Sequence, residues 1–162
     1  MSRLPLVVTA ALGLLATSAA HADNKLYYGS RAGMQVTIVK TSGINGPHAV
    51  ITTKNTRADA TAYCRDYARD LTAKCIDDTM HLDLHTEVKG DCTTGRFTNL
   101  YGEEFQFLGK ARVHKVNVSA NYVIKYLKDG TVADGSSASS YAEHMEIFRK
   151  LCPAKAPSEK DE

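Results

Sequence analysis

Four cysteines limit the folds open to this chain more than any other feature of its sequence. They are Cys64, Cys75, Cys92 and Cys152. An even number of cysteines in an exported protein indicates disulfides, and none of the four belongs to a Cys-x-x-Cys pair, which is typical of zinc sites. Three pairings are possible. We favour a pair between Cys64 and Cys75, because a helix followed by a reversing strand would bring them together. The second pair would then be Cys92 with Cys152, which would join a C-terminal helix to the middle of the chain.

The N-terminal segment predicts that the chain is exported. Arg3 precedes an apolar stretch, residues 4–20, and the stretch ends in Ala20-His21-Ala22. A positive residue, a short apolar core and a small-x-small site form a secretory signal peptide, whereas a membrane span needs about 20 apolar residues. We therefore predict a signal peptide over residues 1–22. In a bacterium the mature protein would be periplasmic.

The rest of the chain is expected to form one domain of nearly balanced charge. We assign residues 23–152 to a single globular domain and residues 153–162 to a disordered C-terminal tail. Without the signal peptide, 19 Lys and Arg residues face 18 Asp and Glu residues. Nucleic-acid binding requires a concentrated basic face, so we expect no nucleic-acid partner. Because no second long apolar run follows, we do not expect the mature chain to span a membrane.

Hydrophobic periodicity in the first half of the domain predicts two strands and a helix. Apolar residues alternate over 33–42 and 48–55, and the hairpin sequence Asn45-Gly46 lies between these segments. The period then changes to that of an amphipathic helix, predicted over 57–71. The capping-box pattern Thr56–Asp59 marks the start of this helix.

The second half predicts more strands and a second helix. Five strands are expected in three segments: 80–88, 96–109, which folds about Gly102, and 121–135, which folds about Asp129-Gly130. A last amphipathic helix is expected over 141–151, ended by Pro153. The predicted fold is therefore α+β, with two amphipathic helices packed on an antiparallel sheet of hairpins and disulfides holding the domain together.

One segment of the predicted strand 80–88 contains residues of the types that bind metals. On a strand, His81, Asp83, His85 and Glu87 would point to the same side. Neighbours two apart lie about 6.6 to 7 Å from each other, but His81 and His85 would be about 13 Å apart, too far to share an ion. The alternative is the solvent-facing side of a half-buried strand. We predict no metal or other cofactor, and keep His81, Asp83 and His85 as candidate ligands.

A hydroxyl-rich segment, GSSASSY over residues 135–141, follows a turn at Asp134-Gly135. Ser140 and Glu143 have the spacing of a capping box for the last helix. Accessible loops on a rigid scaffold are where binding residues gather. Three serines have no structural role of this kind: Ser136, Ser137 and Ser139.

This segment resembles the loop Ser-Gly-Ser-Gly-Ala-x-Tyr of periplasmic and membrane-bound inhibitors of c-type lysozyme. In that family, a small all-β barrel, the loop enters the lysozyme cleft, where its serine and tyrosine contact the catalytic carboxylates. The resemblance covers residues 135–141 and implies that Ser136 or Ser137, together with Tyr141, contacts the enzyme. We take Ser136, Ser137, Ser139 and Tyr141 as the candidate partner-binding residues. The two predicted helices depart from the all-β barrel.

The sequence therefore predicts a periplasmic protein that acts by protein–protein binding rather than as an enzyme. It has no Gly-x-Ser-x-Gly elbow, and its carboxylates are scattered. The expected partner is a peptidoglycan-cleaving enzyme, either a lysozyme or a lytic transglycosylase, which the protein would inhibit. The alternative is a structural protein of the cell envelope that binds peptidoglycan or lipopolysaccharide, with Lys110, Arg112 and Lys115 as its basic cluster.

Overall fold

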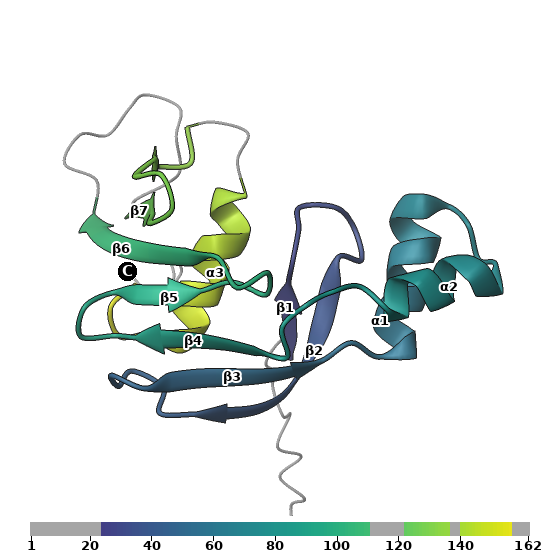
Figure 1. Cartoon of the computed structure of the whole chain (residues 1–162), viewed down its shortest axis with the longest axis horizontal. Coiled ribbons are helices and arrows are strands. Elements are labelled where there is room, and N and C mark those ends of the chain that lie inside the picture. The colour runs from purple at the N-terminus through teal and green to yellow at the C-terminus, as the bar shows by residue number, and fades with distance from the viewer. Residues whose placement is uncertain (1–23, 111–121, 137–139, 157–162) are drawn as a thin grey trace, which may run out of the picture.

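An eight-stranded antiparallel sheet forms the body of the protein. The structure, a computed structural model, describes residues 24–110, 122–136 and 140–156. Each strand pairs with the next along the chain, so the spatial order runs from β1 to β8. The strands are β1 (Lys25–Tyr27), β2 (Gln35–Ser42), β3 (Ala49–Lys54), β4 (Glu87–Asp91), β5 (Arg96–Thr98), β6 (Glu104–Lys110), β7 (Tyr122–Tyr126) and β8 (Val132–Ala133). Figure 1 shows that the sheet is curled.

Helices accompany the sheet at two places, which confirms the predicted α+β class. Helix α3 (Tyr141–Leu151) lies against the sheet, over the range that the sequence predicts. Helix α1 (Arg57–Tyr63) continues into the π-helical turn η1 (Cys64–Ala68), and α2 (Ala73–Met80) packs beside them at one end of the molecule (Figure 1). The predicted helix 57–71 stops earlier, at Ala68, because Arg69 adopts the left-handed conformation with φ 55°. No helix in the described part of the chain is long and apolar enough to cross a membrane.

The predicted strand over 80–88 is wrong in most of its length. Residues 73–80 form α2 instead, and β4 begins only at Glu87. The Thr72 side chain caps α2 by accepting a hydrogen bond from the Cys75 amide. Ile76 and Thr79 then form its buried face. The alternation of apolar residues that follows Met80 lies in an irregular segment, so it does not report a strand.

The main core lies between α3 and the sheet. Ile147, Phe148 and Leu151 of α3 are at most 1 % exposed. Phe148 stacks on Phe107 of β6 at a ring distance of 4.3 Å and packs on Phe97 of β5 at 5.2 Å. These contacts account for the apolar stripe that predicts the helix, and they fix α3 across the strands.

Both predicted disulfides are confirmed. Cys64 pairs with Cys75 at a Cα separation of 6.1 Å, and Cys92 pairs with Cys152 at 5.5 Å. The reason given for the first pair is wrong, since it joins two helical segments rather than a helix and a strand. The second pair ties the end of α3 to the residue after β4, as expected. Beyond it, residues 153–155 are exposed, but Ala156 is 1 % exposed in the main core and the Ala154 amide donates to the Asn45 side chain, so the start of the predicted tail lies against the domain.

Candidate functional site

The serine segment is only partly within the described residues, and its described ends have structural roles. The Ser136 amide and hydroxyl both donate to the Asp134 carboxylate, closing a turn. Ser137 and Ser139 lie outside the described residues. Tyr141 is half-buried at the edge of the main core, and its hydroxyl donates to the carbonyl oxygen of Tyr122 at 2.7 Å. The residue predicted to anchor a partner therefore also anchors α3 to β7.

The predicted capping box at the start of α3 is wrong. Ser140 has φ −71° and ψ 31°, and its side chain makes no capping hydrogen bond. An N-cap hydroxyl reaches the first turn only from an extended backbone, which Ser140 does not adopt. The other predicted box, at Thr56 and Asp59, is confirmed in both of its hydrogen bonds.

The candidate metal ligands are not brought together. The strand on which their arrangement depended is absent, and the His81 ring lies 2.8 Å from the Asp77 carbonyl oxygen of α2. The His85 ring packs against Gly102 in the β5–β6 turn, and its amide donates to the Leu100 carbonyl oxygen. Among the residues that the structure describes, no three His, Cys, Asp or Glu side chains are placed to hold a metal ion. Of the basic cluster, the described residues include only Lys110.

A different candidate site lies beside residues 56–80, which we call the helical unit. A buried carboxylate fastens this unit to the sheet. Asp59 of α1 is 1 % exposed, forms an ion pair with Lys25 of β1 at 2.5 Å, and accepts from the Thr37 hydroxyl of β2 at 2.8 Å. Burial alone would raise the pKa of the Asp59 carboxyl, but hydrogen bonds from Lys25, Thr56 and Thr37 outweigh it and hold the pKa below its usual value.

Two further contacts set the position of the helical unit. Gly33, in the β1–β2 connection, has φ 77° and approaches the α1 backbone so closely that a Cβ atom there would lie 2.5 Å from the Tyr63 nitrogen. Only glycine fits such a position without strain. On the other side, the Asn55 side chain donates to the Thr79 carbonyl oxygen of α2 at 2.8 Å. The unit is therefore held at both of its helices.

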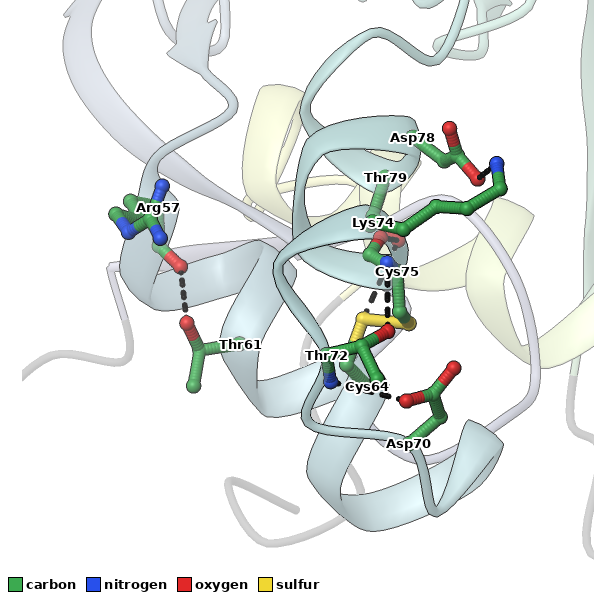
Figure 2. The surroundings of a disulfide bond; sticks show 9 residues. All are labelled: Arg57, Thr61, Cys64, Asp70, Thr72, Lys74, Cys75, Asp78 and Thr79. Carbon is green, nitrogen blue, oxygen red and sulfur yellow. Dashed lines mark hydrogen bonds and ion pairs between the residues drawn. A yellow bond between two sulfur atoms is a disulfide. The ribbon is translucent and has the colours of Figure 1, made fainter.

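Inside the helical unit, the Cys64–Cys75 disulfide joins η1 to α2 (Figure 2). Figure 2 also shows Thr72 capping α2, with its amide hydrogen-bonded to the Asp70 carboxylate. The small core around this disulfide consists of three buried residues, Ala60, Cys64 and Ile76, and is separate from the main core. The disulfide is thus a large part of what holds η1 against α2.

Between the helical unit and the sheet lies a groove of about 460 Å³, which we call the tyrosine groove. Three tyrosines line it. They are Tyr63 of α1, Tyr28, which follows β1 directly, and Tyr101 of the β5–β6 turn. Leu82 and Cys75 also line it. Aromatic and apolar walls with a few polar groups are typical of binding sites.

The polar groups of the groove are tyrosine hydroxyls and charged side chains that already have partners within the protein. Burial, with smaller contributions from Tyr101, Tyr63 and Asp59, raises the pKa of Tyr28 to about 12. Lys74 and Asp78 form an ion pair with each other at 2.7 Å. The Tyr28 hydroxyl is therefore uncharged at neutral pH and can donate a hydrogen bond.

Large apolar side chains are exposed on and beside the groove. Leu82 and Tyr101, which line it, are 43 % and 49 % exposed, and Tyr67 and Leu71 of the helical unit are 46 % and 60 % exposed. Arg31 lies over the Tyr67 ring at 5.6 Å, which links the β1–β2 connection to the helical unit. The sequence analysis missed this site because its residues come from distant segments and form no local pattern.

Comparisons with protein-family models, with curated proteins and with solved structures find no match to this chain. The geometry of the described residues is therefore the basis of the functional proposal.

Proposed function

We propose that this protein is an exported binding protein without catalytic activity, and that a partner protein contacts it at the tyrosine groove. One observation carries the proposal: Leu82 and Tyr101, 43 % and 49 % exposed, line one concave surface, and Tyr67, 46 % exposed, packs on Tyr63 of the same surface at a ring distance of 5.5 Å. Exposed apolar side chains that gather in one place mark interaction sites. Tyrosine is also among the residues that contribute most to the energy of protein interfaces.

The charged groups around the groove are better suited to binding a partner than to catalysis. Lys74 and Asp78 neutralise each other, and the Thr72 backbone amide, helped by its side chain, lowers the pKa of the Asp70 carboxyl. Asp70 therefore stays ionised at neutral pH and is a poor general acid. The aromatic and apolar walls of the groove would receive an apolar side chain from a partner, with the charged groups of Asp70, Lys74 and Asp78 lying around it.

The partner class that we propose is a peptidoglycan-cleaving enzyme of lysozyme type, which the protein would inhibit. Two observations support this class. Residues 135–141 resemble the inhibitory loop of the c-type lysozyme inhibitors, and the exposed aromatic and apolar side chains of the tyrosine groove are suited to contact with a protein. The signal peptide expected over residues 1–22 would place the protein in the compartment where such enzymes act.

A turbidity assay of cell-wall lysis tests this proposal. The exported chain is titrated against a c-type lysozyme and against a lytic transglycosylase, and we expect lysis to slow as the inhibitor approaches one-to-one stoichiometry. Leu82→Ala, which trims the groove, should weaken inhibition about tenfold or more. Leu108→Ala is the matched control, because Leu108 is 49 % exposed on β6 but does not line the groove. Equal inhibition by the two variants would refute the groove as the contact surface.

The serine segment is tested in the same assay. Ser136→Ala removes a hydroxyl that donates to Asp134 within the same turn. If this variant loses inhibition while Leu82→Ala retains it, residues 135–141 are the contact surface, as the resemblance implies. If lysis is never slowed, the partner class is wrong.

Binding of an envelope polymer is the second candidate, and the tyrosine rings favour it. A tyrosine offers a flat apolar face and a hydroxyl, which suit sugar rings as well as protein side chains. Co-sedimentation with purified peptidoglycan, compared between wild type and Tyr101→Ala, tests this candidate. Loss of sedimentation in the variant would support it, whereas sedimentation weakened only by salt would point to basic residues.

A further inference from the structure

The two disulfides differ in their access to solvent. Cys92 and Cys152 are 2 % and 0 % exposed, and both belong to the main core. Cys64 is likewise 0 % exposed, but its partner Cys75 is partly exposed and lines the tyrosine groove. Exchange with a thiol requires that one sulfur be reachable. A reductant that enters the groove therefore reaches Cys75 without any opening of the main core.

The two disulfides also differ in what else holds their surroundings. The Cys92–Cys152 pair is surrounded by the aromatic and aliphatic core between α3 and the sheet. The Cys64–Cys75 pair lies in a cluster whose buried members are Ala60, Cys64 and Ile76. Segments with few buried apolar contacts open at lower free energy than the rest of a protein. Breaking the Cys64–Cys75 bond would loosen the helical unit and leave the sheet intact.

The walls of the groove depend on this bond. Lys74, Cys75 and Asp78 of α2 line one side, and Tyr63 of α1 lies beside them. The fixed anchor at Asp59 holds α1 to the sheet, whereas α2 is joined to the sheet side through the Asn55 hydrogen bond to Thr79. Without the disulfide, α2 would be the more mobile wall.

We propose that the Cys64–Cys75 disulfide is a redox-sensitive clamp: reduction by a dithiol releases α2 and disables the tyrosine groove, and reoxidation by a disulfide, which takes up the two electrons in the reverse exchange, restores it. What the groove binds rests on the proposed function, but the selective chemistry at Cys75 and the release of α2 do not.

The exchange has two steps. A thiolate of the dithiol attacks Cys75 Sγ, which forms a mixed disulfide and breaks the bond to Cys64, so Cys64 leaves as a thiolate and takes up a proton. The second thiol of the reductant then attacks the mixed disulfide, closes the reductant into its own disulfide and releases Cys75 as a thiol. Two electrons pass from the dithiol to the protein, and the two thiol protons end on the two cysteines.

Limited reduction of the folded, exported chain tests the first part. The chain is treated with dithiothreitol under native conditions, sampled over time, alkylated with iodoacetamide and analysed by peptide mass spectrometry. We expect Cys64 and Cys75 to be labelled at least tenfold faster than Cys92 and Cys152. Equal labelling rates, or faster labelling of the Cys92–Cys152 pair, would overturn the proposal.

Hydrogen exchange tests the release of α2. After selective reduction, amides of residues 73–80 should exchange at least tenfold faster, while those of β3, β4 and α3 should keep their rates. The double variant Cys64→Ala/Cys75→Ala gives the same comparison without reductant; if it does not fold, the selectively reduced wild-type chain decides the question. Unchanged exchange over 73–80, or faster exchange throughout the sheet, would contradict a local clamp.

Partner binding tests the consequence. If the oxidised chain inhibits a peptidoglycan-cleaving enzyme, we expect the selectively reduced chain to lose at least tenfold in potency and to regain it on reoxidation. Unchanged potency in the reduced chain would refute the proposal that this disulfide controls binding at the groove. If neither form inhibits any enzyme, the proposed function fails, and the labelling and exchange experiments still decide whether the clamp exists.

Discussion

The buried histidine of α3 should make the protein lose stability as the pH falls from 7 to 5. His144 is 6 % exposed, and its ring packs on Phe105 at 4.1 Å. Burial lowers the pKa of His144 from 6.5 to about 4, although the charge of Glu103 opposes this change. At neutral pH the folded protein therefore holds a neutral imidazole.

The hydrogen bonds around His144 explain why the neutral ring is favoured. Asn99 accepts two backbone amide hydrogen bonds through Oδ1, from Tyr101 and Glu103, so its Nδ2 group must face Glu103 Oε2 and His144 Nε2, the latter at 3.4 Å. Nε2 accepts there, and Nδ1 lies 3.3 Å from the Tyr126 hydroxyl. A protonated ring would place an N–H group against the Asn99 amide donors.

The magnitude follows from the two pKa values. The unfolded chain takes up its proton near pH 6.5, whereas the folded chain does so only near pH 4, so the unfolded state binds more protons in between. The contribution of the neutral His144 side chain to the free energy of unfolding is complete above pH 6.5, and it falls by about 2 kcal/mol between pH 7 and pH 5. Below pH 4 the loss levels off at about 3 kcal/mol.

Urea unfolding of wild type and His144→Gln at pH 7 and pH 5 measures this contribution. Glutamine keeps hydrogen-bonding groups in this position and does not titrate, so the difference between the two proteins should shrink by about 2 kcal/mol at pH 5. His48→Gln, at an exposed histidine outside this network, is the control and should follow wild type. Parallel pH profiles for wild type and His144→Gln would refute the argument.

Three further predictions concern stability. Gly33→Ala should cost about 2 kcal/mol or more in urea unfolding, because it adds a clash with the α1 backbone to the strain of a positive φ; Gly109→Ala, with φ 89° and no described atom within 4 Å of the added Cβ, should cost less. Tyr141→Phe should cost about 1 kcal/mol, since it removes the hydrogen bond to β7. Replacing Cys92 and Cys152 by alanine opens a 60-residue loop and should cost about 4 kcal/mol, seen as a lower midpoint of thermal unfolding.

Those parts of the fold that depend on interactions between residues close in the sequence could be predicted from it. The three predicted hairpins are specified by turn residues, and Asn45, Gly102 and Gly130 all have positive φ values, as such turns require. Helix α3 is predicted by an apolar stripe that a single core face explains. The confirmed Thr56–Asp59 box belongs to the same class, since its two hydrogen bonds span three residues.

The errors arose where tertiary contacts decide between local alternatives. Residues 80–88 alternate like a strand, but α2, which contains Cys75 of the disulfide and the buried Ile76, occupies the chain up to Met80, and the alternating residues before Glu87 are irregular. The tyrosine groove shows the same limit more strongly. Tyr28 and Tyr101 meet only because β1 and the β5–β6 turn are placed by the whole sheet, and no local pattern records that placement.

The stability of this protein and its proposed function depend on different parts of the structure. The sheet, α3 and the Cys92–Cys152 bond share one continuous core, so a change there affects the whole domain. The helical unit has its own small core, and it is fastened to the sheet by contacts that include the Asp59–Lys25 ion pair, the Asn55–Thr79 hydrogen bond and the close approach of Gly33. The Cys64–Cys75 disulfide holds the unit together internally. Because the groove lies between these two parts, its shape depends most on the less stable part, the helical unit. Substitutions in the helical unit should therefore change binding at the tyrosine groove before they change the melting temperature of the domain, and substitutions in the main core should do the reverse.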